Sequence, residues 1–282
     1  MSQTDIEFLR TWVGKENSVT DDFNPFPARA LAAALDHSVL PAKGDALPIP
    51  WHWLYFLDTP TASATGHDGH PKKGGFLPPV PLPRRMWAAG SLQIEQPLLL
   101  GTPAQKKSTI RSVELKDGKS GALVFVTIEH VLQQNGQVCI REEQNVVYRD
   151  MPMAAAPLPP GEIAPDNADW CKTLVPDPVL LFRFSALTYN CHRIHYDRKY
   201  AIEDEFYPAL VVHAPLLATL LLDLVIANCE GERVAKFGFR AVRPSFDLGA
   251  LTVSGKRAGD QVSLWSADHQ GFVGMTANAV LA

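Results

Sequence analysis

The side chains best suited to moving protons gather between residues 184 and 224. Three of the chain's nine histidines lie there, at His192, His195 and His213. The unperturbed pKa of an imidazole is close to neutral, so a histidine can accept and donate a proton at physiological pH. The stretch reads as a strand-like segment, a turn rich in polar side chains and then a strongly apolar helix. We therefore expect this stretch to carry the chemistry.

The overall composition favours work on a small molecule. Hydrophobic residues make up 46% of the 282 positions and charged residues 20%, as in globular proteins with one or two cores. The formal net charge of −4 supplies no basic field for nucleic acid or for an anionic membrane. We therefore expect a small-molecule partner, no nucleic acid and no membrane.

The first residues, the longest apolar run and the cysteines predict no export, no membrane span and no zinc site or disulfide framework. The first ten residues lack a basic segment followed by an apolar one, so no secretory signal is predicted. The longest apolar run, Ala214 to Cys229, is short for a bilayer span and contains Asp223. The four cysteines are widely spaced with no C-x-x-C pair, which predicts free thiols. The expected location is the cytoplasm.

The first half of the chain reads as helices followed by strands. Apolar residues at helical spacing predict one helix over 5–13 and another within 24–40. Residues 47–58 are rich in proline and aromatic residues, which favours an extended strand. Four further strands are predicted at 86–99, 105–115, 122–133 and 137–148, with turn signals at 116–119 and 134–137.

Residues 59–85 read as a long loop, because glycine and proline recur throughout it. Loops of this length inside a compact domain are usually functional or disordered. The loop carries a cluster of basic residues, namely His67, His70, Lys72, Lys73, Arg84 and Arg85. It is either a solvated loop or a lid whose cations meet a phosphate-bearing ligand. We expect no metal at the H-x-x-H spacing, because no cysteine and few carboxylates accompany it.

The second half repeats the order of the first. A linker rich in proline and alanine is predicted over 151–177, followed by a strand at 179–188 and a helix within 207–228. Four strands then follow, at 232–242, 250–256, 261–268 and 272–281. The helix is apolar nearly all round, so we expect a sheet to curl around it. The predicted class is α+β with a weak internal repeat.

One motif carries a family resemblance. The segment N-C-H-R-I-H-Y-D from Asn190, followed by Y-P-A-L-V-V-H-A-P-L from Tyr207, resembles the hydratase motif of MaoC-like, hotdog-fold enoyl-CoA hydratases. W-A-A-G-S before a strand in the first half resembles the degenerate first hotdog of their two-domain branch. The resemblance implies a double hotdog: residues 1–150 as a degenerate hotdog with a lid loop at 59–85, a linker at 151–177, and residues 178–282 as the catalytic hotdog.

The resemblance also implies catalytic residues. The wider family uses a D-x-N-P-x-H turn whose Asp and His position and deprotonate a water. His195 stands at the His position, but Asn190 stands where the family has Asp. An amide cannot accept a proton, so Asn190 is expected to position the water while His195 transfers the proton. Asp197 is the nearest carboxylate in sequence and one candidate to orient the imidazole.

The expected substrate-binding residues follow from the same match. The His213–Ala214 pair stands where the family's backbone N–H polarises the thioester carbonyl, and a helix N-terminus suits a developing negative charge. His192 either stabilises the turn or contacts the substrate. A free substrate carboxylate would need a cation, and the candidates are Arg193, Arg183, Arg84 and Arg85.

The function implied is reversible hydration of a short branched or dicarboxylic enoyl-CoA such as 3-methylfumaryl-CoA (mesaconyl-C4-CoA) or itaconyl-CoA. Such a hydro-lyase needs no cofactor, because the coenzyme A thioester is the substrate itself. A hotdog acyl-CoA thioesterase and a non-catalytic acyl-CoA binding protein are the alternatives. Assembly as a homodimer is left open.

Overall fold

All ten strands of the described residues pair in one continuous antiparallel sheet, in the order β1-β3-β4-β5-β2-β7-β10-β9-β8-β6. The computed structural model describes residues 3–118, 121–152 and 154–282. The first half supplies β1 (Glu16–Asp21), β2 (Arg84–Ile94), β3 (Ala104–Gly118), β4 (Gly121–Gln134) and β5 (Gln137–Arg149). The second half supplies β6 (Trp170–Leu174), β7 (Val234–Ala241), β8 (Leu251–Ala258), β9 (Gln261–Ala267) and β10 (Val273–Leu281).

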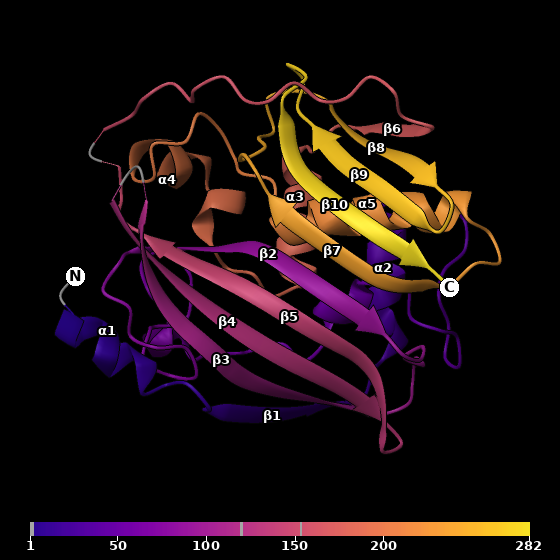
Figure 1. Cartoon of the computed structure of the whole chain (residues 1–282), viewed down its shortest axis with the longest axis horizontal. Coiled ribbons are helices and arrows are strands. Elements are labelled where there is room, and N and C mark those ends of the chain that lie inside the picture. The colour runs from indigo at the N-terminus through magenta and orange to yellow at the C-terminus, as the bar shows by residue number, and fades with distance from the viewer. Residues whose placement is uncertain (1–2, 119–120, 153) are drawn as a thin grey trace.

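The helices lie against this sheet and beside it (Figure 1). In the described part of the chain the α-helices are α1 (Gln3–Arg10), α2 (Pro25–Ala34), α3 (Pro178–Leu187), α4 (Arg198–Glu203) and α5 (Ala214–Asn228). Short 3₁₀ helices are η1 (Trp51–Leu54), η2 (Ala62–Ala64) and η3 (Arg193–His195). The elements β1, α2 and β2–β5 are matched by β6, α5 and β7–β10, which confirms the repeated order.

The helix α5 is the centre of the second half. It contacts all five strands from β6 to β10, and its residues 216–222 are buried without a break. Pro215 lies in the first turn, where its missing N–H removes no helical hydrogen bond. A helix this apolar is stable only when covered on most sides. The predicted wrapping of a sheet around it is confirmed.

The two halves share one joint and one core. Strand β2 pairs with β7, with Ala89 opposite Arg240 and Gln93 opposite Lys236. One cluster of buried residues runs from α2, through Leu31, to α5, through Leu221. The turn predicted at 134–137 is confirmed, since Asn135 and Gly136 both have positive φ as a two-residue hairpin requires. The turn predicted at 116–119 lies partly outside the described residues.

Three predicted elements are wrong. Residues 179–188 form the helix α3, because Pro178 occupies its first turn and the Asp177 side chain accepts a hydrogen bond from Leu180 N–H. The first strand of the second half is instead β6, inside the predicted linker, where it pairs with β8. Residues 47–58 are not a strand, since Trp51 N–H bonds back to Pro48 C=O and the chain turns into η1.

The short strand β1 was not predicted from the sequence. Its pattern E-N-S-V-T-D has one apolar residue, and its pairing with β3 supplies the stabilisation. Among the described helices, none is long and apolar enough to cross a membrane.

Truncation of the central helix is expected to destabilise the protein. Leu221 is completely buried in α5, so Leu221→Ala should lower the free energy of unfolding by about 2–5 kcal/mol. Ile226 on the same helix is 43% exposed, and Ile226→Ala should change it by no more than about 0.5–1 kcal/mol. Urea unfolding measures both. Equal losses would contradict the burial of α5.

Candidate active site

The turn from Asn190 to His195 is built by its own side chains. The Oδ1 atom of Asn190 accepts a hydrogen bond of 3.1 Å from His192 N–H. The chain then enters the 3₁₀ helix η3, which ends at His195. Asn and Asp side chains commonly fix turns in this way. The oxygen of the Asn190 amide is therefore used by the backbone, and its Nδ2 group has no partner among the described residues.

His195 is held in one tautomer. Its Nδ1 lies 2.7 Å from the carbonyl oxygen of Val211, and a carbonyl only accepts, so Nδ1 carries the hydrogen. The Nε2 lone pair is left without a partner from any described residue. Burial lowers the pKa of His195 to about 4, although the hydrogen bond to Val211 opposes that fall. At neutral pH His195 is an uncharged imidazole with a free basic nitrogen.

The ring of His213 packs against the ring of His195. The two rings are stacked with centroids 3.7 Å apart and an interplanar angle of 20°. The side chain of His213 is fully buried, and its Nε2 lies 2.8 Å from Ser185 Oγ on α3. Burial holds the pKa of His213 far below its ordinary value, so it remains neutral. His213 itself is the N-cap of α5, and Ala214 N–H at the helix start has no acceptor among the described residues.

The loop 59–85 docks directly on the turn. The carbonyl of Asp68 accepts a hydrogen bond of 3.0 Å from Arg193 N–H. At Gly69, where φ is +90°, a Cβ atom would lie 1.7 Å from the carbonyl oxygen of Cys191. Only glycine combines this conformation with so close an approach. The loop is thus a fixed wall of the site in this structure.

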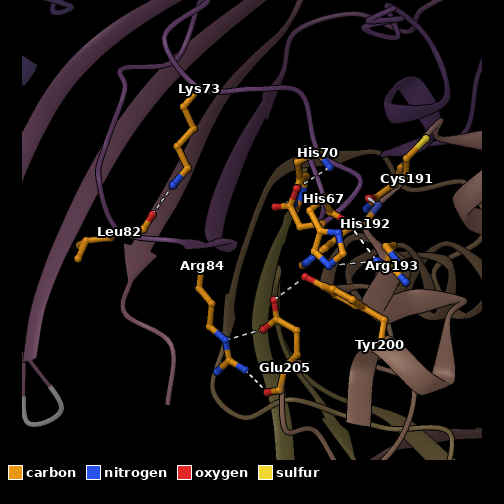
Figure 2. A network of polar contacts seen from close by, with 12 residues as sticks. His67, His70, Lys73, Leu82, Arg84, Cys191, His192, Arg193, Tyr200 and Glu205 are labelled. Atoms are coloured by element: carbon orange, nitrogen blue, oxygen red, sulfur yellow. Dashed lines mark hydrogen bonds and ion pairs between the residues drawn. The ribbon is translucent and has the colours of Figure 1, made fainter. Parts of the chain in front are cut away.

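Two loop side chains accompany that contact. The Nδ1 atom of His70 lies 3.0 Å from Asp68 Oδ2, and the His70 ring packs on His192 with centroids 4.1 Å apart. His192 in turn meets His195 edge to face, at 5.6 Å. Burial lowers the pKa of His192, and the positive charges of Arg84 and Arg85 add to the effect. Figure 2 shows His70, His192 and Arg193 grouped on one side of the network.

Two of the four predicted cations, Arg84 and Arg193, are already paired with carboxylates. Arg84 is buried and donates to both a carboxylate oxygen, at 2.6 Å, and the backbone oxygen of Glu205, as Figure 2 shows. Arg193 donates to Asp197, with its closest contact at 2.7 Å, and lies over the Tyr200 ring. In the described part of the chain Arg85 has no ion pair, yet its charge acts on Asp68, His70 and His192.

The two loop lysines donate hydrogen bonds to carbonyl groups of the same loop. Lys73 donates to the carbonyl groups of Val80 and Leu82, and Lys72 donates to that of Ser63. The expectation of a phosphate-binding lid stays a prediction. A cavity of about 480 Å³ lies beside Tyr207 and Phe246 rather than at His195. It adjoins the site, because Phe246 forms a β-bridge with Val211, whose carbonyl holds His195.

The site therefore differs from the sequence-based expectation in three respects. The backbone of Val211, not Asp197, orients His195; Asp197 caps α4 by accepting from Tyr200 N–H and pairs with Arg193. The side chain of His213 is fully buried and bonds to Ser185, whereas Ala214 N–H has no acceptor among the described residues. Asp68 and Ser185 were not predicted to belong to the site. The sequence marks Gly69 only as one of several glycines in an irregular loop, and its close approach to Cys191 is seen only in the structure.

Comparison with known proteins shows which proteins this chain resembles. The chain is 43% identical to a mesaconyl-C(4)-CoA hydratase of Chloroflexus aurantiacus over 272 residues, 96% of both chains. It is 27% identical to the mitochondrial hydroxyacyl-thioester dehydratase type 2 of Schizosaccharomyces pombe over 73% of this chain and 76% of that one. A crystal structure of a MaoC-like dehydratase from Phytophthora capsici, 13% identical, superposes with a TM-score of 0.68 over 98% of each chain.

The fold and the histidine-bearing turn define a MaoC-like double-hotdog hydratase or dehydratase, as the sequence predicted. The model of the hydroxyacyl-thioester dehydratase type 2 family matches residues 50–247. The chain belongs to that family, and it is a hydro-lyase by family membership.

The contact at Gly69 supplies a test of the site's geometry. Gly69→Ala should displace the loop and lower turnover of an enoyl-CoA substrate, because its Cβ collides with the Cys191 carbonyl. Gly75→Ala in the same loop should be silent, since no atom lies within 4 Å of the added Cβ. Steady-state kinetics on both variants check this. Normal turnover in Gly69→Ala would show that the loop does not form part of the site.

Proposed function

We propose that this protein adds water reversibly to a short branched or dicarboxylic enoyl-CoA, with mesaconyl-C4-CoA as the first candidate and itaconyl-CoA as the second. The observation that carries the proposal is the fixed tautomer of His195, which presents a neutral Nε2 beside the start of α5. The relative that covers nearly the whole chain bears the name of a mesaconyl-C(4)-CoA hydratase, which supports the choice of substrate.

The proposed chemistry uses the groups around His195. Nε2 takes a proton from water, and the oxygen attacks the β-carbon of the enoyl thioester. Charge then develops on the thioester oxygen, where Ala214 N–H and the positive end of the α5 dipole stabilise it. The Asn190 amide positions the water through its Nδ2 group, because its oxygen already accepts from His192 N–H. No step requires a cofactor.

The remaining predicted residues take unequal parts in the proposal. His192 is buried with no hydrogen bond to its ring in the described residues, so we assign it to substrate or water contact. Arg84 and Arg193 are assigned to the structure of the site, because carboxylates already pair with both. Arg85 remains as the cation for a free substrate carboxylate.

The organisation of the chain is part of the same proposal. Residues 178–282 carry the catalytic hotdog, and residues 1–150 lend the loop 59–85 and Arg85. The segment 151–177 connects them, with β6 near its end. An acyl-CoA thioester is the proposed small-molecule partner, and the cytoplasm the proposed location. A homodimer remains an open prediction.

Removal of the proposed base should abolish hydration. His195→Ala and the better space-filling His195→Gln should both lower kcat by about 10²–10⁴-fold, because neither supplies a basic nitrogen. Unfolding curves establish that each variant is folded. In the wild type, rising acidity should inactivate the base only as pH falls through about 4, the pKa of His195. Substantial turnover in either variant would refute the assignment.

Arg85 should determine selectivity for a dicarboxylic substrate. Arg85→Gln should raise KM for mesaconyl-C4-CoA by about 10- to 100-fold, because a charged hydrogen bond contributes roughly 1.5–3 kcal/mol. Crotonyl-CoA has no free carboxylate, so its KM should not change. Arg183, the fourth candidate, is exposed on α3, so we assign it no contact with the substrate, and Arg183→Gln is the matched control. A similar KM change for both substrates would contradict the role of Arg85.

A further inference from the structure

The catalytic turn lacks a carboxylate, yet a carboxylate–imidazole pair lies beside it. Asp68 Oδ2 lies 3.0 Å from His70 Nδ1, and Asp68 Oδ1 accepts a 3.0 Å hydrogen bond from His70 N–H. A carboxylate only accepts, so Nδ1 of His70 carries the hydrogen. The opposite nitrogen, Nε2, has no hydrogen-bond partner among the described residues. Asp68 thereby fixes the ring as the Val211 carbonyl fixes His195.

This pair is held against the turn by backbone contacts. The carbonyl of Asp68 binds Arg193 N–H, and the fit of Gly69 against Cys191 excludes any longer side chain there. The His70 ring packs on His192, which contacts His195 in turn. In Figure 2 the His70 side chain comes from the loop and faces the turn that bears His192. The Asp68–His70 pair is therefore connected through His192 to the proposed base, His195.

The two fixed imidazoles have different supports. His195 donates to a neutral carbonyl, whereas His70 donates to a carboxylate. A carboxylate stabilises the positive imidazolium far better than a carbonyl does. When two titratable groups in one site have environments that separate their proton affinities, the pair divides into acid and base. The Asp68 carboxylate thus helps His70 to hold a proton, whereas no carboxylate does so for His195.

We propose that Asp68 and His70 form the second proton-transfer pair of the hydratase site, with His70 as the catalytic acid and Asp68 as its positioning residue. The proposal rests on the proposed function above. It means that the first half of the chain supplies, from its loop, the carboxylate that the turn lost when Asn190 took the place of Asp.

The proton balance of the step is complete. His195 Nε2 removes one proton from water as the oxygen–β-carbon bond forms, and the electrons of the double bond move toward the thioester carbonyl. His70 Nε2–H delivers a proton to the α-carbon, and the carbonyl is restored. His195 has then gained one proton and His70 has lost one, and exchange with solvent resets both. In dehydration the same two groups exchange roles.

Other charges around His70 set its proton affinity. Burial lowers the pKa of His70, the Asp68 carboxylate opposes that fall, and the cations Arg85 and Lys73 add to it. From the turn, His192 and His195 face the pair, and their pKa values also lie below the ordinary value. Asp68 is thus the described group that favours the acid form of His70.

A bound cation is the competing explanation for this cluster. One ligand atom each from Asp68, His70 and His192 lie within 4.8 Å of one another. Arg85 and Lys73 act on the same group with positive charge, which opposes a further cation. The Asp68–His70 hydrogen bond also occupies the ring nitrogen nearest the carboxylate. Proton transfer therefore accounts for the arrangement better than metal binding.

The direct test follows exchange at the α-carbon. The wild type and two loop variants are incubated with the hydrated product in D₂O, and deuterium at the α-carbon is measured by mass spectrometry. His70→Gln should lose α-exchange and kcat by about 10²–10⁴-fold, with little change in KM. His67→Gln, in the same loop with its ring 79% exposed, should behave as the wild type. Unfolding curves establish the fold of each.

A pH profile tests the part of Asp68. Hydration needs a protonated His70, so activity is lost as pH rises through its pKa. Asp68→Asn removes the group that raises this pKa, and the alkaline limb of the profile should move to lower pH. A merely structural effect of Asp68→Asn would lower the rate without moving the limb, and that result would overturn the positioning role.

Two further outcomes would overturn the proposal. Wild-type α-exchange in His70→Gln would show that His70 takes no part in the reaction. If His195→Gln is inactive in the same assay, the proposed hydratase function still holds, and only the role of His70 is refuted. Loss of wild-type turnover in EDTA, restored by Zn²⁺, would assign the cluster to a metal. If the wild type hydrates no enoyl-CoA, the proposed function fails, and this inference fails with it.

Discussion

The hydrogen bond from His195 Nδ1–H to the Val211 carbonyl is the interaction on which the site depends. It determines that Nδ1 carries the hydrogen and that Nε2 keeps its lone pair. Val211 is itself fixed, because its N–H bonds to Ile194 and it bridges to Phe246. The His213 ring packs against the face of the His195 ring. An imidazole oriented in this way stays neutral at physiological pH, which suits the general base that we propose.

The second requirement is that the two halves meet at this point. Strand β2 joins the halves through β7, and Arg84 at its start forms a buried ion pair with Glu205, just after α4. A buried pair of this kind is costly to break, because removing one partner leaves an uncompensated charge. The loop before β2 is thereby brought to the turn, where Gly69 permits contact. The loop of the first half thus contacts the turn of the second half.

Much of the fold could be predicted from the sequence because local patterns agree with it. The strands β2–β5 and β7–β10 alternate or end in strong turn signals, and α5 is too apolar to be anything but a covered helix. The errors have two physical causes. Residues 179–188 are apolar enough for a strand, yet the local Asp177 cap and Pro178 make them a helix. The strands β1 and β6 have weak patterns of their own and form because they pair with β3 and β8.

The site could be predicted only in part. The spacing of Asn190, His192 and His195 located the turn, but nothing local shows that a backbone carbonyl would orient His195. Asp68 and His70 lie more than 100 positions from the turn, and only the folded loop brings them there. Arg84 and Arg85 are neighbours in sequence, yet one is buried against Glu205 and the other has no carboxylate partner among the described residues. Their difference depends on the opposing half.

Addition of water to a carbon–carbon double bond at this site is tested most directly by the fate of ¹⁸O from labelled water. With mesaconyl-C4-CoA, hydration places ¹⁸O in a new hydroxyl group of an intact thioester. Free coenzyme A, with ¹⁸O in a released carboxylate, would contradict the account and identify a thioesterase.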